Sequence, residues 1–495
     1  MAEEHREREL KFDVPEGWTP PELDALVPKG GRVETETVHL ESTYFDTADR
    51  DLLRSRVTLR RRRGDADTGW HLKVPAGTAR LELRRPLGPD EDGDVPAELA
   101  DLTLGLRAAA PLAAIATLTT ERAVRRVVDG EGRALAEVVV DDVHGTAVGE
   151  AAVITRWREV EVELGEAGDE RVLAQLAEHL RGAGAEPAAS ASKLARALGQ
   201  PPARAEQLDG LARVVADYLD AQYLVLVGND VELRRGRNAV HGTRTASRRY
   251  RSALRVFAPV MDGERAAHLD AELKWYAEVL GRLRDRHVLR EHLDNAVDEL
   301  PPELVLGPVR TRIHQMLDAD LAEAQTVLDR TMAGERYFAL LRELRAWHEQ
   351  PPLALDRPAA DARRFLGKAD RRLRRRLAAA AHPDTDAGRH HATASATASA
   401  TDSADHDAAM HRARKAAKRL RYTAELAEPE VGRPAKRIRK RAKKMQERLG
   451  ARQDSVIAAE FLLRAGRAAG TTPGENGFTF GLLYQRERDA AERAG

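Results

Sequence analysis

The second half of the chain contains an internal repeat, and this duplication is the strongest constraint on its fold. The segment HGTRTASRRYRSALR begins at His241, and the related segment HRARKAAKRLRYTAE begins at His411. Downstream, LGRLRD ends at Asp285 and LGARQD ends at Asp454, which lie 44 and 43 residues after the two histidines. Two segments that match at nearly the same offset indicate a duplicated unit, and apolar residues spaced by three and four around them indicate helices. We therefore expect a duplicated helical domain.

The first part of the chain, up to about residue 200, follows a different pattern. Short runs rich in β-branched and apolar residues alternate with Gly, Pro and Asp, and they occupy 56–63, 69–75, 136–143 and 155–164. This spacing predicts an antiparallel sheet or barrel. Helical patterns interrupt it near 96–117 and 169–182. We therefore expect an α+β protein in which the strands precede an all-α bundle.

The change between the two patterns predicts the domain organisation. The stretch GQPPAR at 199–204 lies where the patterns meet and is typical of a linker. We expect a first domain over 1–198, a linker over 199–205 and a helical domain over 206–495. Within the helical domain, 382–407 is poor in large apolar residues and repeats Ala, Thr and Ser, which predicts a disordered insert.

The composition excludes several classes of protein. The chain has 495 residues, and its 80 lysines and arginines are balanced by 80 acidic residues, so no uniform polyanion-binding surface is implied. It has no cysteine, which excludes disulfides, thiol catalysis and thiolate zinc sites, but not metal sites built on carboxylates. No run of about 18 apolar residues occurs, and the start MAEEHREREL has no apolar signal segment. We expect a cytoplasmic protein without a membrane anchor.

Rows of charge follow the predicted strands of the first domain. Because side chains alternate along a strand, charged residues two positions apart share one face. Three such rows occur: Glu7 with Glu9 and Lys11, Arg60 with Arg62, and Glu159 with Glu161 and Glu163. Val160 and Val162 lie within the last row and face the other way. This arrangement fits a barrel with a charged interior and an apolar outer face that helices cover.

Such rows suit one class of ligand. Carboxylates at alternate strand positions bind hard cations such as Mg²⁺ or Mn²⁺. Lysines and arginines opposite them bind phosphate oxygens, and arginine often does so through two parallel hydrogen bonds. A site with both kinds of row is suited to a metal-chelated polyphosphate.

Several motifs of the first domain resemble those of CYTH domains, which are also called triphosphate tunnel metalloenzymes. In order they are ERELK at 7–11, YFDT at 44–47, LRRR at 59–62, HLKVP at 71–75, VVVDD before 143, EVEVEL at 159–164 and SKLARAL at 192–198. The resemblance covers about residues 4–198. It implies an antiparallel eight-stranded β-barrel whose tunnel hydrolyses or cyclises triphosphate compounds with a divalent metal.

The same resemblance implies the site residues. The ExExK motif supplies the catalytic residues Glu7, Glu9 and Lys11. The metal ligands would be Glu7, Glu9, Asp141, Glu159, Glu161 and Glu163; the glutamate pair that binds the metal can shift by two positions, and Asp142 is an alternative to Asp141. The triphosphate would be held by Lys11, Arg60, Arg62, Lys73, Arg122 and Lys193. Arg125 and Arg126 are alternatives to Arg122, and Arg80 and Glu82 also resemble family positions.

The repeated segments of the second half carry stripes of positive charge. In the first copy, residues spaced by three and four, which would form one face of a helix, are Arg234, Arg237, His241, Arg244, Arg248, Arg251 and Arg255. In the second copy they are His411, Arg414, Lys418 and Arg421, and a dense basic run follows over 436–444. No Asp or Glu occurs between Arg234 and Arg255, so self-repulsion favours an anionic ligand over a solvated face. Aromatic residues for base stacking are few, which disfavours single-stranded nucleic acid.

These segments resemble the CHAD domain, the conserved-histidine α-helical domain, over about 206–490. The motifs are VHGTRTASRRYR, WYAEVLGRLRD, HRARKAAKRLRY and LGARQD, followed by FTFGLLYQRE. The resemblance implies two pseudo-symmetric helical bundles around a basic groove that binds polyphosphate. Its polyphosphate-binding residues would be His241, Arg244, Arg248, Arg251, His411, Arg414, Lys418 and Arg421.

Together the two halves predict a metal-dependent inorganic triphosphatase, with Mg²⁺ or Mn²⁺ as its cofactor and a second domain that binds long polyphosphate. Inorganic triphosphate is the favoured substrate because no segment offers a separate nucleoside pocket. The helical domain would hold substrate near the tunnel or localise the protein to polyphosphate granules. Two alternatives remain, a non-catalytic polyphosphate-binding protein and an adenylate cyclase that uses the same tunnel. Nucleic acid is a disfavoured partner.

Overall fold

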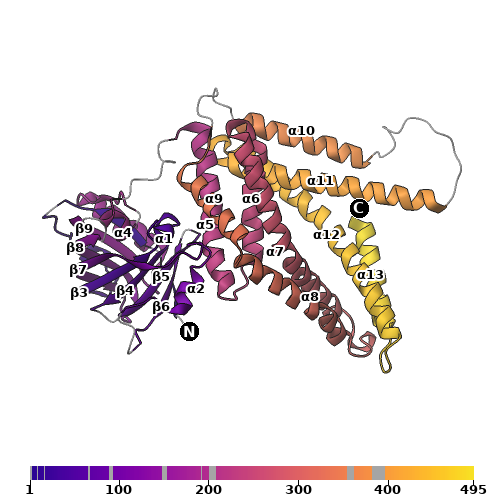
Figure 1. The fold of residues 1–495 in the computed structure, drawn as a ribbon, viewed down its shortest axis with the longest axis horizontal. Helices are drawn as coiled ribbons and strands as arrows, with labels where there is room; N and C mark the ends of the chain where they lie inside the picture. The colour runs from indigo at the N-terminus through magenta and orange to yellow at the C-terminus, as the bar shows by residue number, and fades with distance from the viewer. Residues whose placement is uncertain are drawn as a thin grey trace. The chain divides into compact units, whose positions relative to one another are not determined.

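The chain forms two compact units in the computed structural model (Figure 1). The structure describes residues 3–7, 9–15, 17–64, 67–77, 79–88, 93–147, 153–190, 192–199, 208–353, 362–381 and 396–494. One unit, here the barrel unit, contains Met1–Glu206, Tyr223–Ala239 and Leu341–Glu349. The other, the helical unit, contains Gln207–Gln222, Val240–Leu340 and Gln350–Gly495. The predicted linker at 199–205 lies, except for its first residue, outside the described residues, so the predicted domain boundaries stay a prediction.

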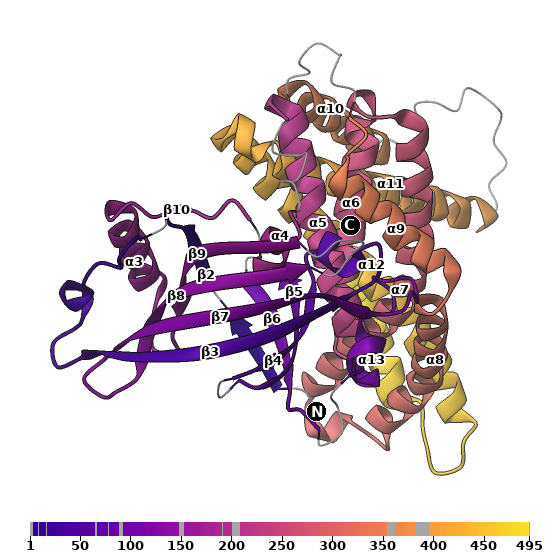
Figure 2. The same ribbon diagram turned by 60° about the vertical axis from the view of Figure 1, so that its left-hand side comes forward.

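The barrel unit is built around one antiparallel sheet (Figure 2). Its strands are β1 (Glu3–Glu7), β2 (Glu9–Asp13), β3 (Arg32–Asp46), β4 (Thr58–Arg63), β5 (Gly69–Ala76), β6 (Ala79–Arg85), β7 (Ala113–Val128), β8 (Ala134–Ala147), β9 (Val153–Leu164) and β10 (Glu186–Pro187). Their order in the sheet is β1-β6-β5-β4-β3-β7-β8-β9-β2-β10. The fold class predicted from the sequence is confirmed for this half, with one correction to the strand count.

The correction concerns the N-terminal run, which we expected to be one strand of an eight-stranded barrel. The described sheet has nine strands of five residues or more, and the two-residue β10 in addition. The difference arises because β1 pairs with β6, where Glu7 lies opposite Arg80, while β2 pairs with β9, where Glu9 lies opposite Glu163. Consecutive segments of the chain thus pair with the two far ends of the sheet, and this pairing closes the sheet into a barrel.

The two faces of the barrel wall differ as the alternation predicts. On β9, Val160 and Val162 are fully buried on the outer side. They pack in one apolar cluster with Leu176 and Leu180 of α3 (Glu170–Gly182). Burial of each such side chain contributes about 2 kcal/mol. The expectation that helices outside the barrel bury the valines is therefore confirmed, and Glu159, Glu161 and Glu163 of β9 face the interior.

Short helices complete the barrel unit, and one of them carries a site residue. They are α1 (Asp51–Arg54), α2 (Ala97–Leu102), α4 (Lys193–Ala197) and the 3₁₀ turn η1 (Asp24–Leu26). The hydroxyl of Ser192 accepts a hydrogen bond of 3.1 Å from the backbone N–H of Ala195 and so caps α4. Lys193 therefore begins a helix, and its side chain is buried.

The second half of the chain is helical, as predicted. Its helices are α5 (Gly210–Arg234), α6 (Val240–Phe257), α7 (Gly263–Asp298), α8 (Val309–Met332), α9 (Glu335–Glu349), α10 (Ala362–Ala381), α11 (Ala396–Val431), α12 (Arg433–Gly470) and α13 (Phe478–Ala494), with 3₁₀ turns η3 (Ala258–Val260) and η4 (Pro302–Leu304). One core joins α7, α8, α12 and α13, and another joins α10, α11 and α12. The repeat corresponds to α6 packed on α7 and α11 packed on α12. No helix among the described residues is both long and apolar enough to cross a membrane.

One expectation for this half was wrong. The basic stripe does not run along one helix from Arg234 to Arg255, because α5 ends at Arg234 and Gly236 adopts a positive φ of 69° before α6 begins. The expected disordered insert at 382–407 stays a prediction, because residues 382–395 lie outside the described residues; the described chain resumes at Ala396, where α11 begins.

Candidate functional site

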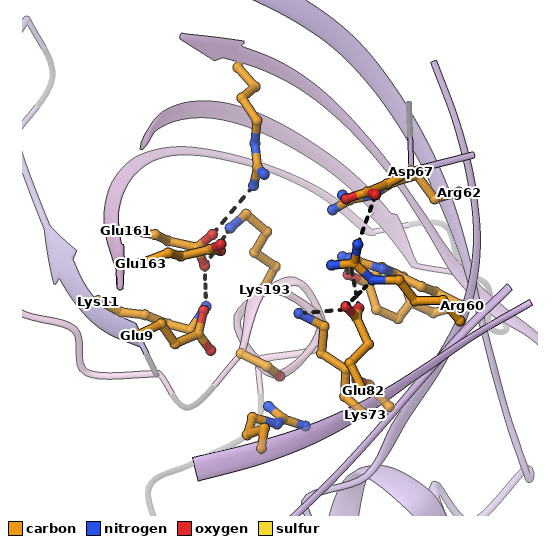
Figure 3. Close-up of a pocket in the computed structure, with 16 residues that line it drawn as sticks. Glu9, Lys11, Arg60, Arg62, Asp67, Lys73, Glu82, Glu161, Glu163 and Lys193 are labelled. Carbon is orange, nitrogen blue, oxygen red and sulfur yellow. Dashed lines mark hydrogen bonds and ion pairs between the residues drawn. The ribbon is translucent and has the colours of Figure 1, made fainter. Parts of the chain in front are cut away.

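A cavity inside the barrel is lined by charged and polar side chains (Figure 3). Nine of the predicted site residues line it: Glu9, Lys11, Arg60, Arg62, Lys73, Arg122, Glu161, Glu163 and Lys193. In Figure 3 the labelled glutamates Glu9, Glu161 and Glu163 lie on one side with Lys11, and Arg60 and Arg62 lie on the other. The tunnel, as we call this cavity, therefore has these three glutamates on one wall and Arg60 and Arg62 on the opposite wall.

The carboxylates of Glu9, Glu161 and Glu163 form a triad that can hold a metal ion. Each offers one oxygen within 4.8 Å of the other two. They come from β2 and β9, whose register places Glu9 opposite Glu163 and Lys11 opposite Glu161. Within the described residues Glu163 has no hydrogen bond or ion pair. Burial and the charges of Glu161 and Glu9 raise the pKa of Glu163, and the charges of Lys73 and Arg122 offset this rise only in part.

A second acidic group, made of Asp141, Glu159 and Glu161, is paired with Lys193. The Nζ atom of Lys193 lies 2.9 Å from Asp141, 2.7 Å from Glu159 and 2.8 Å from Glu161. Burial lowers the pKa of Lys193, but these carboxylates outweigh it and raise that pKa well above its ordinary value. Glu159 also accepts a hydrogen bond of 2.6 Å from the indole of Trp157. Asp141 and Glu159 thus bind protein cations here, although the sequence predicted them as metal ligands.

The remaining cations on this side are also held by carboxylates. Arg122 donates two hydrogen bonds of 2.8 Å to Asp141 and lies 3.3 Å from Glu161. Lys11 forms ion pairs with Glu161 and, at 3.1 Å, with Glu9. Burial lowers the pKa of Lys11, but Glu161 and Glu9 outweigh it and raise the pKa above its ordinary value. Both cations therefore stay protonated in the tunnel.

The opposite wall is formed by β4, β5 and β6. Arg60 and Arg62 alternate on β4, and Lys73 follows on β5, where it lies opposite Glu82 of β6. Glu82 is fully buried and lies 3.5 Å from Lys73 Nζ and 3.9 Å from Arg60 NH2. The phenol of Tyr44 accepts a hydrogen bond of 3.4 Å from Arg60. This wall can bind the oxygens of several phosphate groups at once.

The alternative site residues that the sequence left open lie at different places relative to the tunnel. Asp142 pairs with Arg158 at 2.6 Å, away from the tunnel, whereas Asp141 is fully buried among the tunnel cations. Arg125 donates to the carbonyl of Pro21, and Arg126 pairs with Glu137, so neither occupies the place of Arg122. Glu7 lies on β1, and its side chain is outside the described residues. Arg80 and Glu82 line the tunnel.

The sequence reasoning missed several lining residues: Tyr44, Thr58, Asp67, Arg84 and Ser192. Arg84 had a readable signal, because Arg80, Glu82 and Arg84 alternate on β6 in the same way as Arg60 and Arg62 on β4. Thr58 precedes Arg60 and Arg62 in the same alternation on β4, but it carries no charge that would mark it. Tyr44, Asp67 and Ser192 belong to no alternating charged row, so alternation could not identify them.

In the helical unit the basic stripes of the two repeats meet. Burial together with Arg414, Arg248 and Arg244 lowers the pKa of Lys418 to about 8, which shows that cations of α6 and α11 act on one point. Arg248 donates a hydrogen bond of 2.8 Å to the hydroxyl of Tyr422. The Nε of Arg414 is buried and has no hydrogen-bond partner among the described residues. We call Arg244, Arg248, Arg414 and Lys418 the cation cluster.

The other predicted residues of this site lie at its margins. Burial and neighbouring cations lower the pKa of both His241 and His411. Arg251 pairs with Asp270 at 3.0 Å, and Arg421 contacts Gln446 at 3.3 Å. Arg244 pairs with Asp285 at 2.5 Å. The stripe that lacks acidic residues in its own sequence is thus partly neutralised by aspartates of α7.

Comparison with known proteins agrees with the predicted order of the two domains. A CYTH domain model matches residues 5–198, and a CHAD domain model matches residues 217–463. The uncharacterized protein Rv2226 of Mycobacterium tuberculosis is 36% identical over 516 residues, which cover 99% of this chain and 94% of that protein. Members of the CYTH family are triphosphatases or cyclases, so the barrel has the features of a triphosphate tunnel enzyme.

Solved structures resemble the chain less closely. PptA from Streptomyces chartreusis is 23% identical, with a TM-score of 0.46, and covers 57% of this chain and 95% of its own. The CHAD domain from the plant Ricinus communis is 22% identical, with a TM-score of 0.41, and covers 58% of this chain and 91% of its own. Because these TM-scores are below 0.5, the assignment rests on the sequence matches over nearly the whole length. The chain belongs to the family of proteins in which a CYTH domain is followed by a CHAD domain.

Proposed function

We propose that the barrel hydrolyses inorganic triphosphate to pyrophosphate and phosphate with Mg²⁺ or Mn²⁺, and that the helical unit binds inorganic polyphosphate. The observation that carries the first part is the tunnel itself. A carboxylate triad that lacks a cation at Glu163 lies across one cavity from Arg60, Arg62 and Lys73. A ligand that brings both a divalent cation and a row of phosphate oxygens would satisfy both walls.

The triad fits the expected metal. Glu9, Glu161 and Glu163 offer carboxylate oxygens only, which are the ligands that Mg²⁺ and Mn²⁺ prefer. When bound, such an ion would withdraw charge from the phosphate oxygens and orient the triphosphate. The group of Asp141, Glu159 and Glu161 is less suited, because Lys193 lies within 2.9 Å of all three carboxylates, whereas the triad contains Glu163, which has no ion pair among the described residues.

The protein cations would stabilise the charge that moves during hydrolysis. Water attacks the terminal phosphorus, the bond from that phosphorus to its bridging oxygen breaks, and pyrophosphate leaves with the electron pair. Arg60, Arg62 and Lys73 would bind the oxygens that gain this charge, and their positions are fixed by strand register before substrate binds. Preorganised cations of this kind lower the barrier because no reorganisation is needed during the reaction.

Polyphosphate binding by the helical unit is supported by the cation cluster. A chain of phosphates is flexible and needs only cations, and the buried Nε of Arg414 offers an unused donor. Binding there would either supply substrate or associate the protein with polyphosphate granules.

Phosphate release from inorganic triphosphate, ATP, thiamine triphosphate and long-chain polyphosphate tests the proposal. Each substrate is assayed with Mg²⁺, with Mn²⁺ and with chelator. The variant Glu9→Gln/Glu163→Gln should lose activity by about a hundredfold or more, because removing a group that stabilises transition-state charge typically costs that much. Glu186→Gln changes an exposed carboxylate of the same unit and serves as the matched control.

The outcomes separate the alternatives. Metal-dependent release of phosphate from triphosphate, absent in the double variant, supports the triphosphatase. Release of pyrophosphate and cyclic AMP from ATP would instead identify a cyclase. No turnover of any substrate, with tight polyphosphate binding, would refute the triphosphatase and leave a binding protein.

A further inference from the structure

One histidine of the barrel is not part of the predicted site and yet contacts it. His71 lies on β5, two residues before Lys73, and only 1% of its surface is exposed. Its Nδ1 lies 2.9 Å from Oε1 of Glu82, and its Nε2 lies 2.7 Å from the carbonyl oxygen of Asp67. Both ring nitrogens therefore face oxygens that accept hydrogen bonds.

These two contacts fix the number of protons that the pair carries. A carbonyl oxygen can only accept, so Nε2 must bear a proton to approach it at 2.7 Å. Nδ1 then faces a carboxyl oxygen, and a hydrogen bond of 2.9 Å requires a second proton, on either Nδ1 or Glu82. A neutral ring beside an ionised Glu82 would instead place a lone pair against a carboxylate.

The cations around Glu82 place the second proton on the histidine. Glu82 accepts a hydrogen bond of 2.6 Å from Arg84 and lies 3.5 Å from Lys73 and 3.9 Å from Arg60. Burial raises the pKa of Glu82, but the hydrogen bond with His71 and the charges of Lys73 and Arg60 hold it well below its usual range. With Glu82 ionised, both contacts can form only if His71 donates from both nitrogens, as an imidazolium.

Charged groups of both signs lie around the imidazole ring of His71. Arg60 and Arg62 of β4 and Arg84 of β6 are its cationic neighbours, and Glu82 is the carboxylate that faces it. Burial and the charge of Arg60 lower the pKa of His71, and the hydrogen bond with Glu82 raises it. The net effect of these contributions is a lower pKa. The two short contacts decide between these effects, because both can form only while the pair holds the extra proton.

We infer that His71 is a positioning residue for the phosphate-binding wall: as an imidazolium it ties Glu82 to the backbone of Asp67 and thereby holds Arg60 and Lys73 toward the tunnel. The inference rests on the proposed triphosphatase function. Without the proton, Glu82 would lose one of its partners and would draw Lys73 and Arg60 toward itself. These cations would then be less available to phosphate oxygens, so substrate affinity would fall.

The test compares His71→Gln with the wild-type full-length protein. The amide of Gln can still donate to Asp67 but cannot gain a proton. The Michaelis constant (KM) and kcat for inorganic triphosphate are measured from pH 5 to 9.5 at saturating metal. We expect the KM of the variant to be about tenfold higher while the pair is protonated, because a hydrogen bond to a charged group is lost. The ratio of variant to wild-type KM should fall toward one as the wild type loses the proton, and kcat should change less.

His39→Gln is the matched control, because it makes the same change at an exposed position of β3. The protonation state itself is measured on the wild type without substrate, by ¹H–¹⁵N correlation of ¹⁵N-labelled histidine rings. An imidazolium signal lost in His71→Gln, over the pH range in which the KM ratio is high, supports the inference. A neutral His71 ring throughout, or a KM ratio that is within twofold of one or does not follow the ring's protonation, overturns it.

A Glu82→Gln background distinguishes positioning from a general packing effect. If His71 acts through the charge of Glu82, adding His71→Gln to Glu82→Gln should change KM by less than about twofold. Additive effects in the double variant would refute the coupling. Failure of the proposed function is recognised separately, because then the wild type turns over no triphosphate at any pH while the NMR measurement still reports on His71.

Discussion

Removing the charge of Lys418 should make the protein more stable and a weaker binder of polyphosphate. Lys418 lies on α11 at the centre of the cation cluster. Burial and the guanidinium groups of Arg414, Arg248 and Arg244 lower its pKa to about 8, and the opposing charge of Asp454 offsets this only in part. Keeping this ammonium group protonated at neutral pH therefore destabilises the folded state.

The size of this effect follows from the pKa. The difference between about 8 and the ordinary value of 10.5 corresponds to about 3 kcal/mol. Between these pH values the unfolded chain binds more protons than the folded one, so the free energy of unfolding rises with pH through this window. Below about pH 8 Lys418 is protonated in both states, and its charge then destabilises the folded state by the full amount of about 3 kcal/mol. Lys418→Gln should recover up to about 3 kcal/mol at pH 7.

Thermal unfolding of the full-length variant at pH 7 and pH 10 measures this gain. About 3 kcal/mol corresponds to an increase in Tm of several degrees at pH 7. The increase should be much smaller at pH 10, where most of the wild-type Lys418 is neutral in the folded state. Lys415→Gln removes an exposed lysine one turn earlier and should leave Tm nearly unchanged. A lower Tm for Lys418→Gln at pH 7, or an equal increase at both pH values, would refute the reasoning.

Polyphosphate should restore the proton that Lys418 loses. A bound polyanion raises the pKa of the lysine, so binding at pH 8 should take up about half a proton at this site. Calorimetric titration with polyphosphate in two buffers of different ionisation enthalpy measures this uptake. The uptake should disappear in Lys418→Gln and persist in Lys415→Gln, and binding to the first variant should be weaker.

Three further changes have defined outcomes. Leu180→Ala should lower the unfolding free energy of the barrel by about 2–5 kcal/mol, measured by urea denaturation, because Leu180 is fully buried against the outer wall. Gly281→Ala should not destabilise the protein, because the new Cβ would lie at an ordinary contact distance of 3.5 Å from Cζ of Arg244. Alanine also favours the helix over glycine by up to about 1 kcal/mol, so a loss of Tm would contradict this prediction. Burial raises the pKa of Asp46 to about 6, so stability should fall as pH rises from about 4 to 6, and Asp46→Asn should remove this dependence of Tm on pH.

Much of the barrel could be predicted because its wall alternates strictly. Val160 and Val162 facing one way and Glu161 and Glu163 the other leave a single consistent arrangement for β9. The split of the N-terminal run could not be predicted, because the pattern of ERELK is the same whether one strand or two consecutive strands carry it. Only the pairing partners distinguish the two cases, and pairing between distant segments leaves no local pattern.

The residues of the site were predicted better than their partners. Row alternation identified Glu161 as an interior charge, and the family resemblance implied Lys193, but neither could show that Lys193 pairs with Asp141 and Glu159. That contact joins α4 to β8 and β9, and its geometry depends on where the cap at Ser192 starts a helix. In the same way, the absence of acidic residues between Arg234 and Arg255 concealed Asp270, which lies on the next helix and pairs with Arg251.

The cations of the tunnel and those of the cation cluster should respond differently to an anionic ligand. In the tunnel, Lys11 and Lys193 are each paired with several carboxylates that raise the pKa of both. These cations are stable without a ligand, so a phosphate must compete with glutamates for them, and a metal ion that takes up the carboxylate charge removes this competition. In the cation cluster the pKa of Lys418 falls instead, because burial and the guanidinium groups of Arg414, Arg248 and Arg244 outweigh the opposing charge of Asp454. A polyanion alone would relieve that repulsion, so polyphosphate binding by the helical unit should persist in chelator, under conditions in which turnover in the tunnel stops.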